Sequence, residues 1–174
     1  MNDSQEKILK EFFKSTWKTN SFDENLIAEI KSLNPRNVLD VGCGFNLYKG
    51  HIPNLYGIDI VNPEADLICD VLDFKPPLKY QVIMCLGSIN FGTESEIIER
   101  LKYLKVLLED DGHLFMRVNP GILWKEKPEL NIFPWTKELI HQLGAKAGLS
   151  VDGDISEYDT PRGTRLRFTY IHSC

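Results

Sequence analysis

Two glycines and two aspartates are the residues of this 174-residue chain whose spacing points most directly to chemistry. Gly42 and Gly44 follow a short apolar run in the stretch NVLDVGCG, where glycine lets the backbone turn sharply and approach a ligand closely. Asp59 ends the apolar stretch YGID, and Asp70 ends the next one, LICD. Backbone amides freed at a glycine turn bind anionic groups, and carboxylates accept hydrogen bonds from hydroxyl and amino groups. The set suits a nucleoside ligand, with Asp59 at a ribose and Asp70 at an amino group such as that of adenine.

A third glycine separates two kinds of nucleotide-binding protein. A dinucleotide-binding loop carries it at position 47 in this register, where it brings the following helix close to the pyrophosphate. Leu47 occupies that position. A nicotinamide-dependent oxidoreductase is therefore disfavoured.

Short apolar runs alternate with turns and helical patterns along most of the chain. Such alternation is typical of a mostly parallel sheet with helices on its faces. We therefore predict an α/β fold: a doubly wound, Rossmann-like, mostly parallel seven-stranded sheet in a three-layer sandwich, with an antiparallel C-terminal strand. Ligands of such a sheet bind beyond the carboxyl ends of the strands, where the glycines and aspartates lie. The predicted strands cover residues 38–41, 55–60, 66–69, 81–86, 113–118, 149–151 and 166–171.

Helices are predicted where apolar residues recur at helical spacing. Two of them precede residue 34, one follows the fourth strand and one follows the fifth. Side-chain caps mark where three of them begin, because a capping box satisfies amides of the first turn. These caps are Asp3 with Glu6, Ser21 with Glu24, and Thr93 with Glu96; the third helix is expected to end at Asp111–Gly112 and the fourth to begin at Thr136.

The pattern predicts a single domain over residues 1–174, with residues 1–34 as a helical cap and residues 37–174 as the core. Segment 119–135, NPGILWKEKPELNIFPW, is too irregular for a regular element and too aromatic for a plain linker. We predict a lid or substrate loop there. Its aromatic side chains either stack on a substrate or pack the lid down. They are Trp124, Phe133 and Trp135.

Composition narrows the range of partners. The formal net charge is −5, and no apolar run reaches the roughly 20 residues that a membrane span needs, so we expect neither nucleic acid nor a membrane as partner. The N-terminal sequence MNDSQEKILK lacks the order of a secretory signal, which predicts a cytoplasmic protein. The four cysteines are scattered, with no histidine at ligand spacing, so neither a disulfide framework nor a metal site is expected.

From Asn37 to its C-terminus the sequence resembles the class I S-adenosylmethionine-dependent methyltransferases. The resemblance is carried, in order, by VLDVGCG, YGIDI, CDVLDF, VIMCLGSINFG, LKYLKVLLEDDGHLFMRV and TKELIHQLGAKAGLSV. It implies S-adenosylmethionine as cofactor, with its methionine part at the glycine loop, its ribose at Asp59 and its adenine between Asp70 and Val71. The residues after the fourth strand would line the floor of the site. The implied cofactor-binding residues are Asp40, Gly42, Cys43, Gly44, Asp59, Ile60, Asp70, Val71, Cys85, Leu86 and Gly87.

The sequence departs from the family pattern in three ways. Asn46 stands where the family often has a third glycine of its own, and Gln81 stands where an acidic residue commonly precedes the fourth strand. The segments between the first three strands leave room for a turn of helix at most, so one helical layer must be thin. Either the N-terminal helices or a second subunit, as in a homo-oligomer, must then cover an apolar sheet face. These departures keep open an alternative function, a non-catalytic accessory module with a methyltransferase fold.

The sequence says least about the methyl acceptor and the catalytic groups. Asn90, Arg117 and Asn119 lie just beyond the fourth and fifth strands and are the candidates to orient an acceptor; Arg117 suits a carboxylate or phosphate. No Asn/Asp-Pro-Pro-Tyr/Phe motif follows the fourth strand, so we expect a small-molecule acceptor rather than nucleic acid. The segment before the first strand commonly closes over the ligand in this family. Its candidate contacts are Trp17, Thr19 and Asn20.

Overall fold

The structure, a computed structural model, describes residues 7–8, 10–12, 23–120, 128–160 and 163–173. Several predictions made from the sequence lie outside these ranges. They concern the caps Asp3, Glu6 and Ser21, and the ligand contacts Trp17, Thr19, Asn20 and Trp124.

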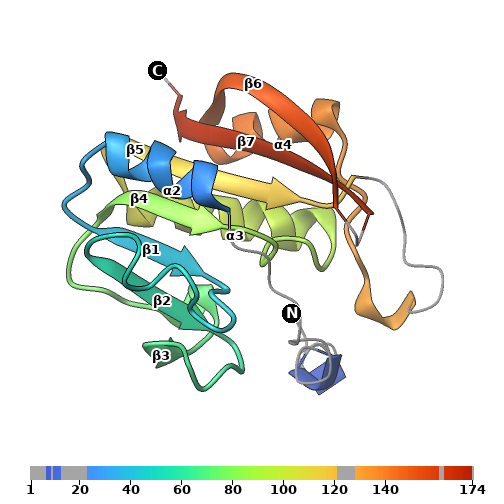
Figure 1. Cartoon of the computed structure of the whole chain (residues 1–174). Helices are drawn as coiled ribbons and strands as arrows, with labels where there is room; N and C mark the ends of the chain where they lie inside the picture. Colours follow the sequence, from blue (N-terminus) through green and yellow to red (C-terminus); the bar gives the residue numbers. More distant parts are fainter. Residues whose placement is uncertain (1–6, 9, 13–22, 121–127, 161–162, 174) are drawn as a thin grey trace.

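Seven strands of the described chain form one sheet in the order β3-β2-β1-β4-β5-β7-β6 (Figure 1). The pairs from β3 to β5 are parallel, and β7 is antiparallel to both of its neighbours. This confirms the predicted mostly parallel seven-stranded sheet with an antiparallel C-terminal strand. The strands are β1 Val38–Val41, β2 Leu55–Asp59, β3 Leu67–Ile68, β4 Tyr80–Cys85, β5 Leu108–Val118, β6 Leu149–Thr160 and β7 Gly163–His172.

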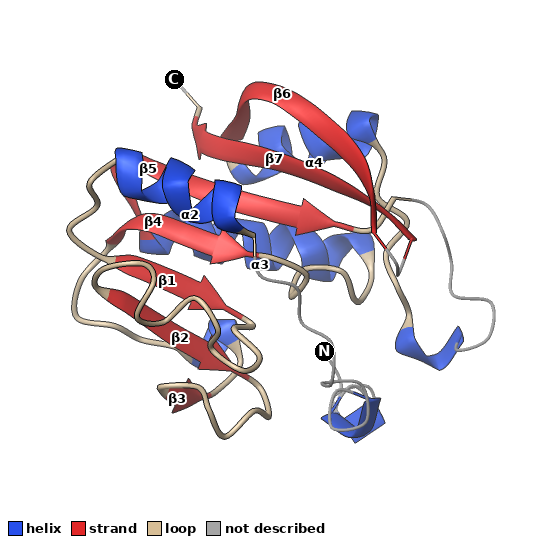
Figure 2. Ribbon diagram, viewed as in Figure 1, coloured by secondary structure: helices blue, strands red, loops and turns tan. Residues whose placement is uncertain are grey.

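Helices cover both faces of the sheet, which makes the predicted three layers (Figure 2). Helix α2 (Glu24–Ser32) lies on one face, and α3 (Glu94–Leu107) and α4 (Lys137–Ala147) lie on the other. The core is split accordingly: the larger buried cluster packs against α3 and α4, and a smaller one packs against α2. Two short 3₁₀ helices, η2 (Val71–Asp73) and η3 (Pro128–Leu130), lie in the connections.

Two of the predicted helix starts are confirmed by side-chain caps. The Thr93/Glu96 capping box is present at α3, and the Thr136 hydroxyl accepts a hydrogen bond from the Leu139 amide at 3.1 Å at the start of α4. The second predicted helix begins later than predicted: α2 begins after Asp23, whose carboxylate accepts from the Leu26 amide at 3.1 Å. Asp23 has extended backbone and stands directly before the first helical residue, which is the geometry of an N-cap.

The predicted end of α3 at Asp111–Gly112 is also wrong. The helix ends at Leu107, and Leu108 already pairs with Tyr80 of β4. Gly112 serves close packing instead, because a Cβ atom there would lie 2.8 Å from Leu108 Cδ1. Tertiary strand pairing has therefore ended the helix about one turn earlier than the local pattern indicates.

The connection between β1 and β2 contains turns and no helix, so the α2 face of the sheet is thin as predicted. Tyr48 and Ile52 from this connection pack with Leu26, Ile27 and Ile30 of α2. Helix α2, together with Tyr48 and Ile52, therefore covers the sheet face that the short connection leaves without a helix.

Candidate functional site

A cavity of about 340 Å³ opens beyond the carboxyl ends of the parallel strands. This is where ligands of an open α/β sheet bind. All but one of the predicted cofactor-binding residues line it, and so do the three residues proposed to orient an acceptor. These lining residues are Asp40, Gly42, Cys43, Gly44, Asp59, Ile60, Asp70, Val71, Leu86, Gly87, Asn90, Arg117 and Asn119.

The glycine loop is built by close contact between the ends of β1 and β4. Gly42 has a φ of +74°, and a Cβ atom there would lie 2.5 Å from Ser88 Cβ. The Ser88 hydroxyl donates to the Val41 carbonyl at 2.6 Å. Only glycine fits both the backbone conformation and the space at this position.

Asn46, at the position where the resemblance predicts a glycine, holds the rest of the loop. It has a φ of +56°, a left-handed conformation that asparagine tolerates. Its Nδ2 donates to the Glu64 carbonyl at 3.1 Å and to Asp66 Oδ2 at 3.3 Å. Asp66 Oδ2 also accepts from the Gly57 amide at 2.9 Å, and hydrogen bonds, including one from Lys49, lower its pKa. These contacts take the place of the helix that is missing after β1.

Asp40 at the end of β1 is a buried carboxylate without a partner. It is 2% exposed, and its side chain makes no hydrogen bond or ion pair with any residue that the structure describes. Burial raises its pKa to about 7, an effect that the charge of Arg117 reduces and that of Asp59 increases. A carboxylate in this state gains strongly from a cation placed beside it in the cavity.

Asp59 at the end of β2 is already largely occupied. Its Oδ2 accepts from the Gly44 amide at 3.0 Å, and its Oδ1 accepts from the Val61 and Asn62 amides at 2.9 and 3.0 Å. A carboxylate has about four lone-pair positions, so one remains for a ligand. The geometry therefore suits one ribose hydroxyl rather than both.

Asp70 at the end of β3 forms an ion pair that sequence reasoning missed. Its two oxygens accept from Arg100 Nη1 and Nη2, each at 3.0 Å, and Oδ1 also accepts from the Leu72 amide at 3.0 Å. The bonds from Arg100 and Leu72 lower the pKa of Asp70. Arg100 stands on the apolar face of α3 between Ile97 and Leu104, and a charged residue in that stripe was the signal for a buried partner.

Asn90 holds loops together and offers little of its amide to a ligand. Its Nδ2 donates to the Gly87 carbonyl and its Oδ1 accepts from the Asn119 amide, both at 3.0 Å. Its own carbonyl accepts from the Phe133 amide at 2.8 Å. Asn90 thereby joins the connections after β4 and β5 to the predicted lid, which is a positioning role; its direct contact with an acceptor stays a prediction.

The described part of the predicted lid packs down on the protein. Trp135 is fully buried, and its indole N–H donates to the Ile89 carbonyl at 3.0 Å. Phe133 contacts it edge-on, with ring centroids 5.1 Å apart. The sequence left two alternatives for these aromatic side chains, stacking on a substrate or packing the lid down. Phe133 and Trp135 pack the lid down.

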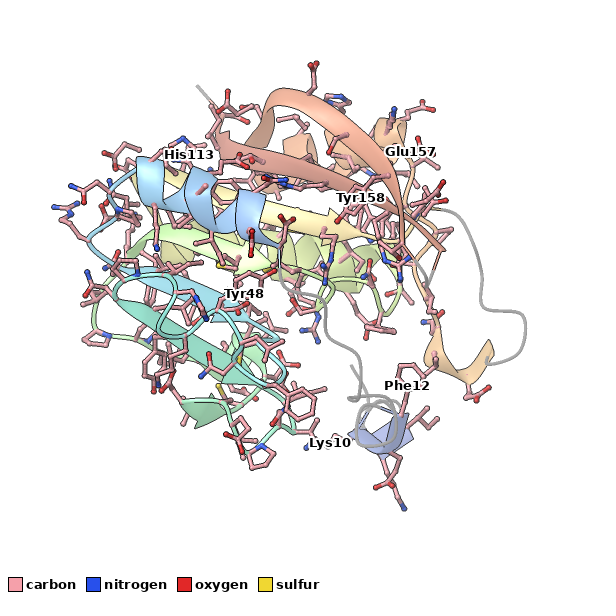
Figure 3. The ribbon with its side chains drawn as sticks, in the orientation of Figure 1. Lys10, Phe12, Tyr48, His113, Glu157 and Tyr158 are labelled. Carbon is pink, nitrogen blue, oxygen red and sulfur yellow. The ribbon has the colours of Figure 1, made fainter. Side chains whose placement is uncertain are left out.

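An apolar cluster closes the cavity at its outer side. Phe12, in the N-terminal segment, points toward η3, and Figure 3 shows the two close together. Phe12 and Phe91 both pack against the small cluster that contains Ile132, and all three line the cavity. The sequence reasoning did not single out Phe12, although it lies on the apolar side of the first predicted helix. The other lining side chains it missed include Tyr48 and Arg100.

Cys85 is the predicted cofactor contact that the structure does not place at the cavity. Its side chain is fully buried in the larger core cluster, on the same side of β4 as Ile83. The residues that follow β4, beginning with Leu86 and Gly87, line the cavity instead. Burial raises the pKa of the Cys85 thiol, and it raises that of Cys43, which does line the cavity. Neither thiol has the low pKa of a reactive cysteine.

The described residues also bear on metal binding and on membrane spans. No group of three or more His, Cys, Asp or Glu side chains among them has the arrangement of a metal site. No helix in the described ranges is both long and apolar enough to cross a membrane.

No protein-family model matches the sequence, and no curated protein matches it. Solved structures match its fold. The 1,6-didemethyltoxoflavin-N1-methyltransferase of Burkholderia thailandensis has a TM-score of 0.77 at 15% identity, over 98% of this chain and 87% of that chain. For magnesium protoporphyrin IX methyltransferase from Synechocystis PCC 6803 the TM-score is 0.75 at 15% identity, over 99% and 100%.

The N-methyltransferase NodS from Bradyrhizobium japonicum WM9 has a TM-score of 0.72 at 13% identity, over 98% of this chain and 99% of that chain. The first and third of these structures contain S-adenosylhomocysteine, and the second contains S-adenosylmethionine. At such identities the likeness establishes the fold, and the described chain has the fold of the class I S-adenosylmethionine-dependent methyltransferases.

Proposed function

We propose that the protein binds S-adenosylmethionine in this cavity and transfers its methyl group to a small-molecule acceptor. The observation that carries the proposal is the unpartnered carboxylate of Asp40, buried beside the glycine loop. The methionine part of this cofactor has an α-ammonium group, which is the cation that such a carboxylate needs.

The other cavity residues fit the rest of the cofactor. Asp59 keeps one acceptor position for a ribose hydroxyl, and Val71 and Asp70 lie together where the adenine is expected. The cavity of about 340 Å³ has a volume typical of small-molecule sites. These features support Asp40, Asp59 and Asp70 as contacts of the ammonium, ribose and adenine, in the order of their strands.

Bound S-adenosylmethionine supplies a methyl group on a sulfonium, which leaves as a neutral thioether. The chain contributes by holding an acceptor nucleophile in line with that methyl group, and positioning alone lowers the barrier of such a reaction by several kcal/mol. None of the described residues lining the cavity is a histidine. A base is needed only for an acceptor whose nucleophile carries a proton, so we assign none.

A small-molecule acceptor is supported by the chemistry of similar proteins and by charge. Two of the similar structures are named for 1,6-didemethyltoxoflavin and magnesium protoporphyrin IX. The net charge of −5 gives no general attraction for nucleic acid.

Calorimetric titration with S-adenosylmethionine, S-adenosylhomocysteine and NAD tests the proposal. We expect micromolar binding of both adenosyl ligands and none of NAD. If neither adenosyl ligand binds, the proposed function is wrong and the accessory-module alternative is favoured.

A further inference from the structure

Three arginines share one face at the carboxyl end of β5 and the adjoining part of β7. Arg117 of β5 and Arg167 of β7 are directly paired in the antiparallel ladder. Residues paired in this way project to the same side of the sheet, and Arg165, two residues from Arg167, projects there too. The three charges therefore lie along the edge of the site where β5 ends.

Arg117 differs from the other arginines whose pairing the structure gives. Arg167 is paired with Asp23, at 3.6 Å, and with Glu29 of α2. Arg36 and Arg100 each pair with one carboxylate. For Arg117, no carboxylate among the described residues lies within ion-pair distance. Its Nε donates to the Leu86 carbonyl at 3.1 Å, and Nη2 donates to the same oxygen.

The surroundings of Arg117 suit an anionic ligand with an apolar body. Arg117 is only partly exposed and lines the cavity together with Arg165 and Asn119. Phe91 and Ile132 supply apolar wall on the outer side. Asp40 affects Arg117 through its charge, but under the proposed function that carboxylate is taken by the cofactor's ammonium group. The guanidinium is then left facing the cavity without an anion.

We propose that Arg117, with Arg165 beside it, forms an acid-binding subsite, and that the methyl acceptor is a small molecule carrying a carboxylate or phosphate group. The inference rests on the proposed function, since it assumes that an adenosyl cofactor fills the Asp40 end. A guanidinium fork binds such oxyanions through paired, charge-assisted hydrogen bonds, and a partly buried position strengthens them.

Both an acidic acceptor and the cofactor offer an oxyanion to Arg117, because S-adenosylmethionine has a carboxylate of its own. Calorimetry at pH 8 distinguishes them with two titrations. The first compares S-adenosylhomocysteine with 5′-methylthioadenosine, which lacks the amino-acid part. The second adds benzoate, phenyl phosphate or the uncharged benzamide to protein saturated with S-adenosylhomocysteine.

Three variants are compared with the parent protein. Arg117→Gln removes the charge, and Arg117→Lys keeps the charge but loses the fork. Arg167→Gln is the matched control, because Arg167 lies on the same face, is paired with carboxylates and does not line the cavity. A thermal melt of each variant checks that it is folded, since the contact of Arg117 with the Leu86 carbonyl is lost in the glutamine variant.

We expect the saturated parent protein to bind an acid probe and not benzamide. Arg117→Gln should weaken that binding by about tenfold or more, and Arg117→Lys by less, because only the lysine keeps the charge. Binding of S-adenosylhomocysteine should stay unchanged in Arg117→Lys, which keeps the positive charge that lowers the pKa of Asp40, and Arg167→Gln should match the parent in every titration.

Other results overturn the assignment. If Arg117→Lys, like Arg117→Gln, weakens S-adenosylhomocysteine but not 5′-methylthioadenosine, the arginine binds the cofactor's carboxylate and not an acceptor. If neither the acid probes nor S-adenosylhomocysteine depend on Arg117, it only supports the Leu86 carbonyl. Failure of the parent protein to bind S-adenosylhomocysteine at all contradicts the proposed function itself and is seen before any variant is made.

Discussion

The two ends of the cavity treat a carboxylate in opposite ways. At the β3 end, Asp70 is held by both Nη atoms of Arg100 and by the Leu72 amide, and these contacts lower its pKa. At the β1 end, Asp40 is more deeply buried and has no partner among the described residues, and burial raises its pKa. The charge of Asp70 is paired within the protein, whereas that of Asp40 is paired only when a cation binds.

The paired carboxylate, Asp70, serves the stability of the fold, whereas the unpaired one, Asp40, serves ligand binding. A paired carboxylate contributes to the folded state, and breaking the pair leaves an uncompensated buried charge. An unpaired one costs stability until its ligand arrives, which is a common feature of functional sites. Removing charge at the two ends should therefore have opposite effects on the free energy of unfolding.

The largest expected effect is at the Arg100 end. Arg100→Met should lower the free energy of unfolding by about 3 kcal/mol, because Asp70 stays charged without its partner. Urea denaturation at pH 8 measures it. Arg36→Met is the control: its pair with Glu109 is largely exposed, so it should cost less than about 1 kcal/mol. Equal losses in the two variants would contradict the assignment of Arg100 as a buried structural partner.

Asp59, between the two ends, should behave like Asp70. Asp59→Ala removes three hydrogen bonds from backbone amides, so it should cost about 2–3 kcal/mol of stability and also weaken S-adenosylhomocysteine. Denaturation and calorimetry on the same variant measure both. Asp59→Asn keeps one acceptor oxygen and should fall between the parent and Asp59→Ala. Full stability in Asp59→Ala would show that the loop does not depend on this carboxylate.

Asp40→Asn should do the reverse at the other end. The pKa of Asp40 is raised in the folded state, so the folded protein binds a proton that the unfolded chain has lost between about pH 4 and pH 7. Stability from this group therefore falls as pH rises through that window, and the full cost is present above pH 7. Asp40→Asn lacks the charge and should be more stable than the parent at pH 8 by about 2 kcal/mol, with the difference shrinking toward pH 4.

Denaturation midpoints from pH 4 to pH 8 measure this difference. Asp152→Asn, at an exposed position of β6, is the control and should leave the pH profile unchanged. A loss of stability in Asp40→Asn at pH 8 would mean that the ionised carboxylate has a stabilising partner in the folded protein.

The same titration should appear in ligand binding. Asp40 must lose its proton to pair with an ammonium group, so the affinity for S-adenosylhomocysteine should fall by about tenfold per pH unit below a pKa of about 7. Calorimetry between pH 5.5 and pH 8 measures the slope. In Asp40→Asn the affinity should be low at every pH and the slope absent, whereas 5′-methylthioadenosine should show no slope even with the parent protein.

Much of the fold could be predicted because its signals are local. The alternation of apolar runs and turns identified all seven strands, and the caps at Thr93 and Thr136 marked helix starts correctly. The errors came where a distant contact competes with a local preference. Leu108 continues the helical pattern but pairs with Tyr80 of β4, so the strand begins there.

In the candidate site, too, local signals were predicted from the sequence and distant contacts were not. The motif and the general rule for parallel sheets placed the glycine loop and the aspartates at one edge, and the structure brings them together around one cavity. Their roles toward a cofactor stay predictions. Cys85 does not line the cavity, because it is the last residue of β4 and packs into the core, whereas the lining begins at Leu86. Asn90 was read as a ligand contact because its bond to the Asn119 amide, 29 residues away, leaves no local trace.

By itself, the sequence determined the type and order of the elements and the residues at the strand ends, because hydrogen-bond caps, turn residues and side-chain periodicity act over a few neighbouring residues. The tertiary structure alone decided which charges are paired. Arg100 meets Asp70 across 30 residues, and Arg117 meets the Leu86 carbonyl across 31. Ion pairing depends on distances of a few ångströms between segments that only the packed sheet brings together. That packing paired the charge of Asp70 and left the charge of Asp40 for a ligand.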